Sequence, residues 1–289
     1  MIWLRTWVQF PPPPPSFHVK NAGWTVDMRN EMATKKGMLI PLLIAFLASL
    51  AAKADDWKWS QYGLPKSELK TCIPDTRGKN DSWWIPYFHN KLKQPRKDLL
   101  FIGDSITDLW TYPADHRYPG GLNTWSRRYK EIATNFGVTG DKTQTVLWRL
   151  TEGKSLEGYA PKHIVLLIGI NNLLQGDTPE DTATGIRAVV NYLRKVLPDS
   201  KVLLLGIFPC HSKPNDPIRA KIKAVNDQIK NPADSKSVYF ADIGSVFLEK
   251  DGSITKEVMR DLLHLSPKGY EMWANALEPR LRVLFNGGN

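Results

Sequence analysis

The sequence predicts an α/β fold, a flavodoxin-like three-layer α/β/α sandwich around a central five-stranded parallel sheet. From Asp98 onward, short apolar runs alternate with longer amphipathic segments, which is the pattern of βαβ units. No repeat or low-complexity linker interrupts residues 55–289, so we expect one domain there. The flavodoxin-like strand order 2-1-3-4-5 would bring the carboxyl ends of the first three strands together at one edge.

Residues 1–31 are interpreted as an over-extended start that lies outside this domain. Pro11 to Pro15 form an unbroken proline run with no periodic pattern around it. Such a run cannot build a packed core. We therefore expect translation to begin near Met32.

Residues 32–54 have the three parts of a secretory signal peptide. Lys35 and Lys36 form a basic region, residues 38–52 are apolar, and Ala52-Lys53-Ala54 is a small-x-small cleavage site. A spanning helix is the less favoured alternative, because a bilayer requires about 20 apolar residues and this run is shorter. We expect cleavage after Ala54, a secreted or periplasmic protein, and no membrane insertion afterwards.

The charge and cysteine content of residues 55–289 narrow the classes of partner. Their 33 Lys/Arg and 27 Asp/Glu give a formal charge of +6, without a concentrated basic stripe, so nucleic acid is not an expected partner. Export would permit a disulfide between Cys72 and Cys210, and two buried free thiols are the equal alternative. Since no Cys/His cluster has metal-ligand spacing, we expect no structural zinc. The chemistry expected of this chain also requires no other metal and no cofactor.

The elements follow in order along the chain. Residues 55–80 are polar and turn-rich, and we interpret them as an extended segment whose aromatic side chains pack on the domain. Residues 83–93 form a predicted helix, because Trp84, Phe88 and Leu92 recur at a spacing of four. The predicted strands are 98–102, 132–136, 164–168, 202–207 and 238–241. The predicted helices between and after them are 142–150, 179–197, 216–228 and 267–284, the last starting after a Ser266-Pro267 cap.

Ser105 is the candidate nucleophile. The apolar run before it stops at Gly103-Asp104-Ser105, so a tight turn would lift one hydroxyl out of the sheet edge. Open α/β sheets place their chemistry at that edge. The alternative is that Ser105 only caps the next helix.

Three further stretches offer what a serine nucleophile needs. Gly140 follows the second strand and could turn a backbone N–H toward an oxyanion, and Asn171 follows the third strand and could add a side-chain amide. Asp261 and His264 lie three residues apart before the last helix, which suits an acid that orients a general base. Taken singly, Gly140 could be a turn glycine, Asn171 an Asx-turn former and Asp261 an exposed loop acid.

Together these stretches resemble a known family. Gly-Asp-Ser at 103–105, Gly140, Gly-x-Asn at 169–171 and Asp-x-x-His at 261–264 resemble the four signature blocks of the SGNH, or GDSL-type, esterases and acylhydrolases. Residues 146–150, Val-Leu-Trp-Arg-Leu, are similar to the branch of platelet-activating-factor acetylhydrolase catalytic subunits and their bacterial relatives.

The resemblance implies the SGNH hydrolase fold and a role for each motif residue. Ser105 would be the nucleophile, His264 the base and Asp261 its orienting acid. The oxyanion hole would consist of the N–H groups of Ser105 and Gly140 and the side chain of Asn171. The sequence departs from the pattern at Asn172, where many members have aspartate.

The expected activity is hydrolysis of short-chain esters, acetyl above all. Ile106 and Leu263 flank the reacting residues and are candidate walls of a small acyl pocket. The aromatic, glycine-rich loop from Trp110 to Trp125 would suit a polysaccharide ester, although these rings could equally pack on the core. His211 has no acid at a suggestive spacing and is interpreted as structural.

Two other functions compete with this interpretation. One is a lysophospholipase or arylesterase that acts on lipid or other small-molecule esters. The other is a non-catalytic glycan-binding protein on the same scaffold, because a fold alone does not fix a function. An intact Ser105, Asp261 and His264 set favours an enzyme.

Overall fold

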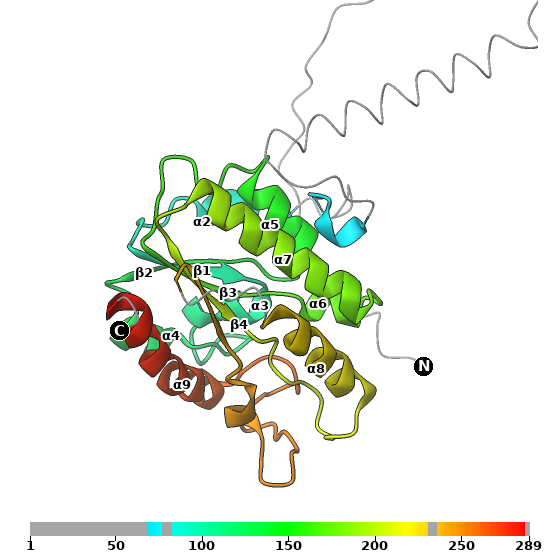
Figure 1. Ribbon diagram of the computed structural model, residues 1–289. Coiled ribbons are helices and arrows are strands. Elements are labelled where there is room, and N and C mark those ends of the chain that lie inside the picture. Colours follow the sequence, from blue (N-terminus) through cyan, green and yellow to red (C-terminus); the bar gives the residue numbers. More distant parts are fainter. Residues whose placement is uncertain (1–68, 77–82, 231–235, 287–289) are drawn as a thin grey trace, which may run out of the picture. The chain divides into compact units, whose positions relative to one another are not determined.

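The computed structural model describes residues 69–76, 83–230 and 236–286 (Figure 1), all of which belong to one compact unit, Ala54–Asn289. The expected signal peptide, the over-extended start and most of the segment 55–80 lie outside the described residues. Among the helices that the structure describes, none combines the length and the apolar character that crossing a bilayer requires.

A five-stranded parallel sheet with the order β2-β1-β3-β4-β5 forms the centre of the fold, which confirms the predicted order. Gly103 ends the central strand and pairs with Gly137 on one side and Leu167 on the other. A Cβ at Gly103 would lie 2.2 Å from Thr107 Oγ1 and 2.4 Å from the Leu167 carbonyl oxygen, so only glycine fits. The strands are β1 Leu99–Gly103, β2 Ala133–Gly137, β3 His163–Leu167, β4 Lys201–Leu205 and β5 Val238–Ala241.

Helices cover both faces of the sheet, as expected for a three-layer sandwich (Figure 1). Helix α7 packs against α5 and α8 on one face, and α4 packs with α9 on the other. The longer helices are α2 Trp84–Lys91, α5 Thr143–Leu150, α7 Pro179–Val196, α8 Pro217–Ile229 and α9 Pro267–Asn286. The shorter ones are α3 Ser105–Asp108, α4 Leu122–Arg128 and α6 Ile170–Leu174, with 3₁₀ helices η1 Lys70–Cys72, η2 Leu109–Thr111 and η3 Gly244–Phe247.

All predicted strands and helices that fall on described residues are present, with their ends displaced by at most two residues. The short helices α3, α4 and α6 were not predicted. They contain between four and seven residues. One or two turns are too few to display a helical period.

The tryptophans of the aromatic loop belong to the core. Trp110 and Trp125 are buried. The centroid of the Trp110 ring lies 4.6 Å from that of Tyr270 and 4.7 Å from that of Trp273, both on α9. The expectation that these two rings stack on sugars is therefore wrong, and the core-packing alternative holds. Tyr112 in the same loop is only half-buried.

Both cysteines are buried free thiols, which decides between the two alternatives left open by the sequence. Cys72 lies in η1 and Cys210 lies after β4. Burial raises the pKa of the Cys210 thiol to about 12, so this thiol stays protonated at neutral pH.

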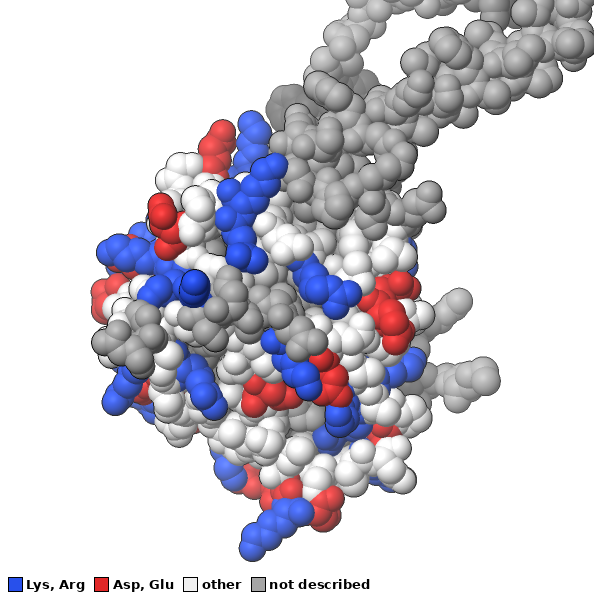
Figure 2. Space-filling view, viewed as in Figure 1, with Lys and Arg blue, Asp and Glu red and all other residues white. Residues whose placement is uncertain are grey.

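Charges of both signs lie side by side on the molecular face seen in Figure 2. Exposed pairs such as Lys162 with Asp98 and Lys223 with Asp227 bring opposite charges within 2.7 Å and 2.5 Å. Pairs of this kind contribute little to stability, since water and salt screen them.

Candidate active site

Ser105 lies where the central strand turns into a short helix. Asp104 is the N-cap of α3, because its Oδ1 accepts a hydrogen bond from the Ile106 N–H at 2.9 Å. Ser105 is the first helical residue, so the alternative in which it caps the helix is wrong. Its side chain is free of any capping role and can serve another purpose.

A hydrogen-bonded chain joins a serine, a histidine and a carboxylate. Ser105 Oγ lies 2.9 Å from His264 Nε2, and His264 Nδ1 lies 2.8 Å from Asp261 Oδ2. In the tautomer with its proton on Nδ1, the imidazole donates to Asp261 and accepts from Ser105. Two segments that are 159 residues apart in the sequence thus form the arrangement of a catalytic triad.

The Asp261 carboxylate also builds the turn that presents His264. Its Oδ1 accepts the backbone N–H groups of Leu263 at 3.2 Å and His264 at 2.7 Å, which leaves Oδ2 for the imidazole. Partial burial acts to raise the pKa of Asp261. The hydrogen bonds and charge of His264, with the nearby Arg260 guanidinium, outweigh burial and hold this pKa well below its usual range.

Leu262, between the acid and the base, adopts the left-handed conformation with φ of +65°. Its carbonyl accepts the His211 N–H at 2.7 Å. The His211 side chain in turn lies 3.0 Å from Asp216 Oδ2, at the start of α8. The prediction that His211 has no acidic partner is therefore wrong, because a loop bend joins residues whose sequence spacing matches no regular element.

Gly140 and Asn171 meet at one turn. The Asp141 N–H donates to the Val138 carbonyl at 3.1 Å, and Gly140 has φ of +80° within this turn, a conformation that favours glycine. Asn171 Nδ2 donates to the Asp141 carbonyl at 2.9 Å. Since β1 lies between β2 and β3, the segments that carry Ser105, Gly140 and Asn171 leave the same edge of the sheet.

A buried ion pair, which no sequence motif indicated, supports this turn. Arg149 Nε lies 2.7 Å from Asp141 Oδ2, and both side chains are at most 1% exposed. Trp84 Nε1 donates to the other oxygen of Asp141 at 2.8 Å. The available signal was an arginine inside the apolar run of residues 146–150.

Asp104 is, after Asp261, a second carboxyl group whose pKa is shifted from its usual value. Burial, with the charges of Asp141 and Asp108, raises its pKa to about 7 against the opposing hydrogen bond from Ile106. Among the described residues, its Oδ2 has no hydrogen-bond partner. Burial thus makes the acid beside Ser105 hold its proton to a higher pH than an ordinary aspartate does.

The two candidate walls of an acyl pocket differ in their surroundings. Ile106 is 2% exposed and lies in the core, and its carbonyl accepts a hydrogen bond from Tyr270 Oη at 2.7 Å. Leu263 is half-buried beside His264. Only Leu263 thus has side-chain surface available to a substrate, and the acyl-pocket role stays a prediction.

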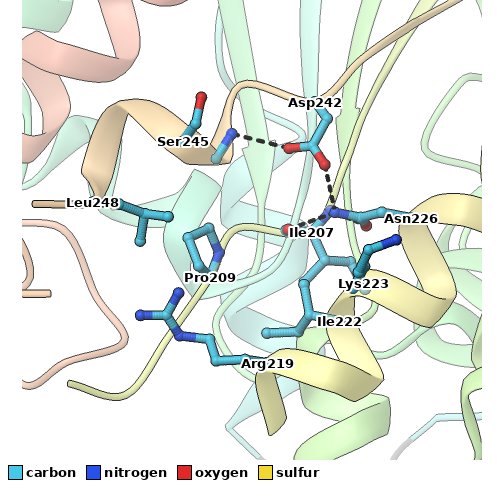
Figure 3. A pocket seen from close by; sticks show the side chains of 10 residues that line it. Ile207, Pro209, Arg219, Ile222, Lys223, Asn226, Asp242, Ser245 and Leu248 are labelled. Carbon is cyan, nitrogen blue, oxygen red and sulfur yellow. Dashed lines mark hydrogen bonds between the residues drawn. The ribbon is translucent and has the colours of Figure 1, made fainter. Parts of the chain in front are cut away.

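A cavity of about 230 Å³ lies away from these residues (Figure 3). Its walls come from α8 and from the segments after β4 and β5, and Asp242 on its rim accepts hydrogen bonds from Asn226 Nδ2 and the Gly244 N–H. Neither Ser105 nor His264 lines it. Within the described part of the chain, no group of three or more His, Cys, Asp or Glu side chains could hold a metal ion.

Comparison with known proteins agrees with the motifs and the fold. The model of the GDSL-like lipase/acylhydrolase family matches residues 101–272. Subunit alpha1 of platelet-activating factor acetylhydrolase IB from Rattus norvegicus is 35% identical over 218 residues, which cover 73% of this chain and 87% of that protein.

Two solved structures share the fold. A GDSL-like lipase from Bacteroides thetaiotaomicron is 18% identical with a TM-score of 0.53, and covers 69% of this chain and 97% of its own. An acetylxylan esterase from Geobacillus stearothermophilus is 20% identical with a TM-score of 0.50, and covers 64% of this chain and 93% of its own. The expected SGNH-type fold is confirmed, and the chain belongs to the GDSL-like lipase/acylhydrolase family of carboxylic ester hydrolases.

Proposed function

We propose that this protein is a secreted serine esterase that removes short acyl groups, acetyl above all, from small-molecule or carbohydrate esters. The observation that carries the proposal is the hydrogen-bonded chain from Ser105 through His264 to Asp261. A glycan-binding protein without catalysis would not need this chain.

The first half-reaction would form an acyl-enzyme. Ser105 Oγ attacks the ester carbonyl while His264 Nε2 takes its proton, and Asp261 stabilises the imidazolium that results. The N–H groups of Ser105 and Gly140 and the Asn171 amide would hold the oxyanion. One N–H of that amide donates to the Asp141 carbonyl, which orients the other N–H. The imidazolium then protonates the leaving alcohol.

The second half-reaction would release the acid. His264 takes a proton from water, and the water oxygen attacks the acyl carbon. The bond to Ser105 Oγ breaks, and the imidazolium returns its proton to that oxygen. Neither half-reaction requires an oxidation or a reduction.

The acetyl preference rests on two observations. The rat relative at 35% identity is named an acetylhydrolase. In addition, Leu263 places an apolar side chain next to the base, which would shorten the space for an acyl chain. For carbohydrate esters the support is narrower, namely the half-buried Tyr112 and Tyr118 rings in the loop after η2.

Covalent labelling tests the proposed nucleophile. A fluorophosphonate probe should label the parent protein once and should not label Ser105→Ala, which should also lose hydrolysis of nitrophenyl acetate. The exposed Ser126 on α4 gives a matched control, since Ser126→Ala should label and hydrolyse as the parent does. A Ser105→Ala variant that folds and retains the parent rate would contradict the proposal.

A substrate series tests the acyl and leaving-group preferences. We expect kcat/KM for nitrophenyl esters to fall from acetate to octanoate, and the reverse order would exclude an acetyl preference. Acetylated xylan, acetylated simple sugars and lysophospholipids would then separate a carbohydrate esterase from a lysophospholipase or arylesterase. Export would be checked by the N-terminal sequence of the secreted protein, which should begin at Asp55.

A further inference from the structure

Asp108 is a buried carboxylate for which the triad arrangement has no use. Its side chain is 0% exposed and meets four donor groups. Lys91 Nζ and Tyr87 Oη lie 2.5 Å and 2.7 Å from Oδ1. The N–H and the hydroxyl of Thr139 donate to Oδ2 at 3.1 Å and 2.7 Å.

These contacts join the two segments that the proposed reaction must hold together. Asp108 is the last residue of α3, and Ser105 is the first. Thr139 precedes Gly140 in the turn that carries the proposed oxyanion donor. One carboxylate therefore fixes the distance between the helix of the nucleophile and that turn.

Two further contacts with β2 make this junction tight. Asn135 Nδ2 on β2 donates to the carbonyls of Thr107 at 2.9 Å and Asp108 at 3.2 Å. A Cβ at Gly137 would lie 2.3 Å from the Asp108 nitrogen, so α3 packs directly on the end of β2. A displacement of the Asp108 side chain would therefore move Thr139 relative to Ser105.

Lys91 supplies the charge that makes a buried carboxylate tolerable. It lies seven residues after Trp84 on the buried face of α2, and its side chain is 8% exposed. Burial and the charge of Asp108 raise the pKa of Tyr87, so Tyr87 keeps the proton that it donates. Lys91 thus balances the charge of Asp108, and the hydrogen bonds from Tyr87 and Thr139 fix the orientation of its carboxylate.

We propose that Asp108 is a positioning residue, which aims the Gly140 N–H at the oxyanion by holding Thr139 against the helix of Ser105. This inference rests on the proposed function, because it assumes that Ser105 attacks and Gly140 donates. Oxyanion donors act only within a narrow range of distance, and the loss of one donor typically costs 10²–10³ in kcat. Misdirection of one donor should therefore lower kcat more than it changes KM.

The test compares Thr139→Val with Thr139→Ser. Both variants keep the backbone N–H, but only serine keeps the hydroxyl that donates to Asp108. With nitrophenyl acetate we expect kcat to fall about tenfold in Thr139→Val with KM within about twofold, and to stay near the parent value in Thr139→Ser. Thr71→Val, at a buried threonine that donates to the Asp181 carbonyl, should leave kcat unchanged.

A second set of variants separates positioning from stability. Asp108→Asn should lower both kcat and the unfolding temperature, because it leaves Lys91 buried without its partner. Addition of Lys91→Met should restore the unfolding temperature while kcat remains at least about tenfold below the parent. An unchanged kcat in Thr139→Val, or recovery of kcat together with stability in the double variant, would overturn the proposal.

The fluorophosphonate experiment distinguishes a failure of the role proposed for Asp108 from a failure of the proposed function. If Ser105→Ala loses labelling and hydrolysis while Thr139→Val keeps the parent kcat, only the role of Asp108 is wrong. If Ser105→Ala retains activity, the triad assignment is wrong, and the role of Asp108 falls with it.

Discussion

The nucleophile side and the acid–base side of the candidate site are built in different ways. Ser105 and Gly140 rest on two fully buried carboxylates, Asp108 and Asp141, each paired with a cation from a neighbouring helix. The cations are Lys91 on α2 and Arg149 on α5. The geometry of this side therefore depends on the packing of several elements around the sheet edge.

The acid–base side is held mainly by its own short segment. Asp261 is 35% exposed and His264 is 21% exposed, and the Asp261 side chain bonds to groups within three residues of it. One backbone hydrogen bond from His211 to Leu262 ties the segment to its neighbour. Changes here should alter the reaction rate without unfolding the protein, whereas changes on the nucleophile side should alter stability as well.

The largest expected effect is a loss of rate at the acid–base side. His264→Ala removes the proposed base, so kcat/KM should fall on the order of 10⁴-fold or more. The unfolding midpoint in urea should stay close to that of the parent, because the imidazole is partly exposed. Kinetics with nitrophenyl acetate would measure the first quantity.

His211 offers a matched control for this experiment. It is also a partly exposed histidine paired with a carboxylate, Asp216, but among the described residues no serine pairs with its other nitrogen. Asparagine tolerates the left-handed backbone at this position, where φ is +62°. His211→Asn should keep the parent rate within a few fold, and a loss comparable to that of His264→Ala would contradict the assignment of the base.

The next effect is a loss of stability at the nucleophile side. Arg149→Met leaves the buried charge of Asp141 without the guanidinium that balances it, and this should cost about 3–5 kcal/mol of unfolding free energy. Addition of Asp141→Asn should recover part of this loss, because the uncompensated charge is gone. Urea unfolding measures both changes, and a midpoint unaffected by Arg149→Met would show that the two sides do not differ in this way.

A smaller effect is the pH dependence of stability at Asp104. Its pKa is about 7 in the folded chain and near the usual 3.8 in the unfolded chain, so the folded chain binds this proton more tightly. The raised pKa therefore adds its full contribution to the free energy of unfolding below about pH 4. This contribution is lost as the pH rises toward about 7. Asp104→Asn keeps the acceptor for the Ile106 N–H and cannot ionise.

The Asp104→Asn variant should therefore lose less stability than the parent between pH 5 and pH 8. We expect a difference on the order of 2 kcal/mol between the two losses. Urea unfolding at both pH values gives this difference directly, and contributions from other titrating groups cancel between the two chains. Equal losses in the two proteins would mean that Asp104 ionises with an ordinary pKa.

The same contrast explains what the sequence could predict. Four of the strands, β1, β3, β4 and β5, were predicted because buried parallel strands are mainly apolar runs, and β5 matches its predicted range at both ends. Ser105, Gly140, Asn171, Asp261 and His264 stand in short motifs, so the order of these motifs along the chain was enough to propose the site.

The residues that hold the site in place could not be predicted from the sequence. The partnership of Asp108 with Lys91 depends on where the fold places α2 relative to α3, and no local pattern encodes that placement. A lysine seven residues after Trp84, on an apolar helix face, was the one signal available. The buried state of Trp110 and Trp125 was equally hidden, because composition does not distinguish a core ring from an exposed one.

The smallest expected effect concerns the strain stored at the acid–base side. At Leu262 the left-handed backbone is costly for an L-residue, and it is least acceptable for a β-branched side chain, which crowds the backbone. Leu262→Val should therefore be less stable than Leu262→Asn by about 1 kcal/mol, although valine resembles leucine more closely and this side chain packs partly on the core. Urea midpoints of the two variants would measure the order. If valine proved the more stable, side-chain packing rather than backbone conformation would govern this position, and the segment would depend on the core as the nucleophile side does.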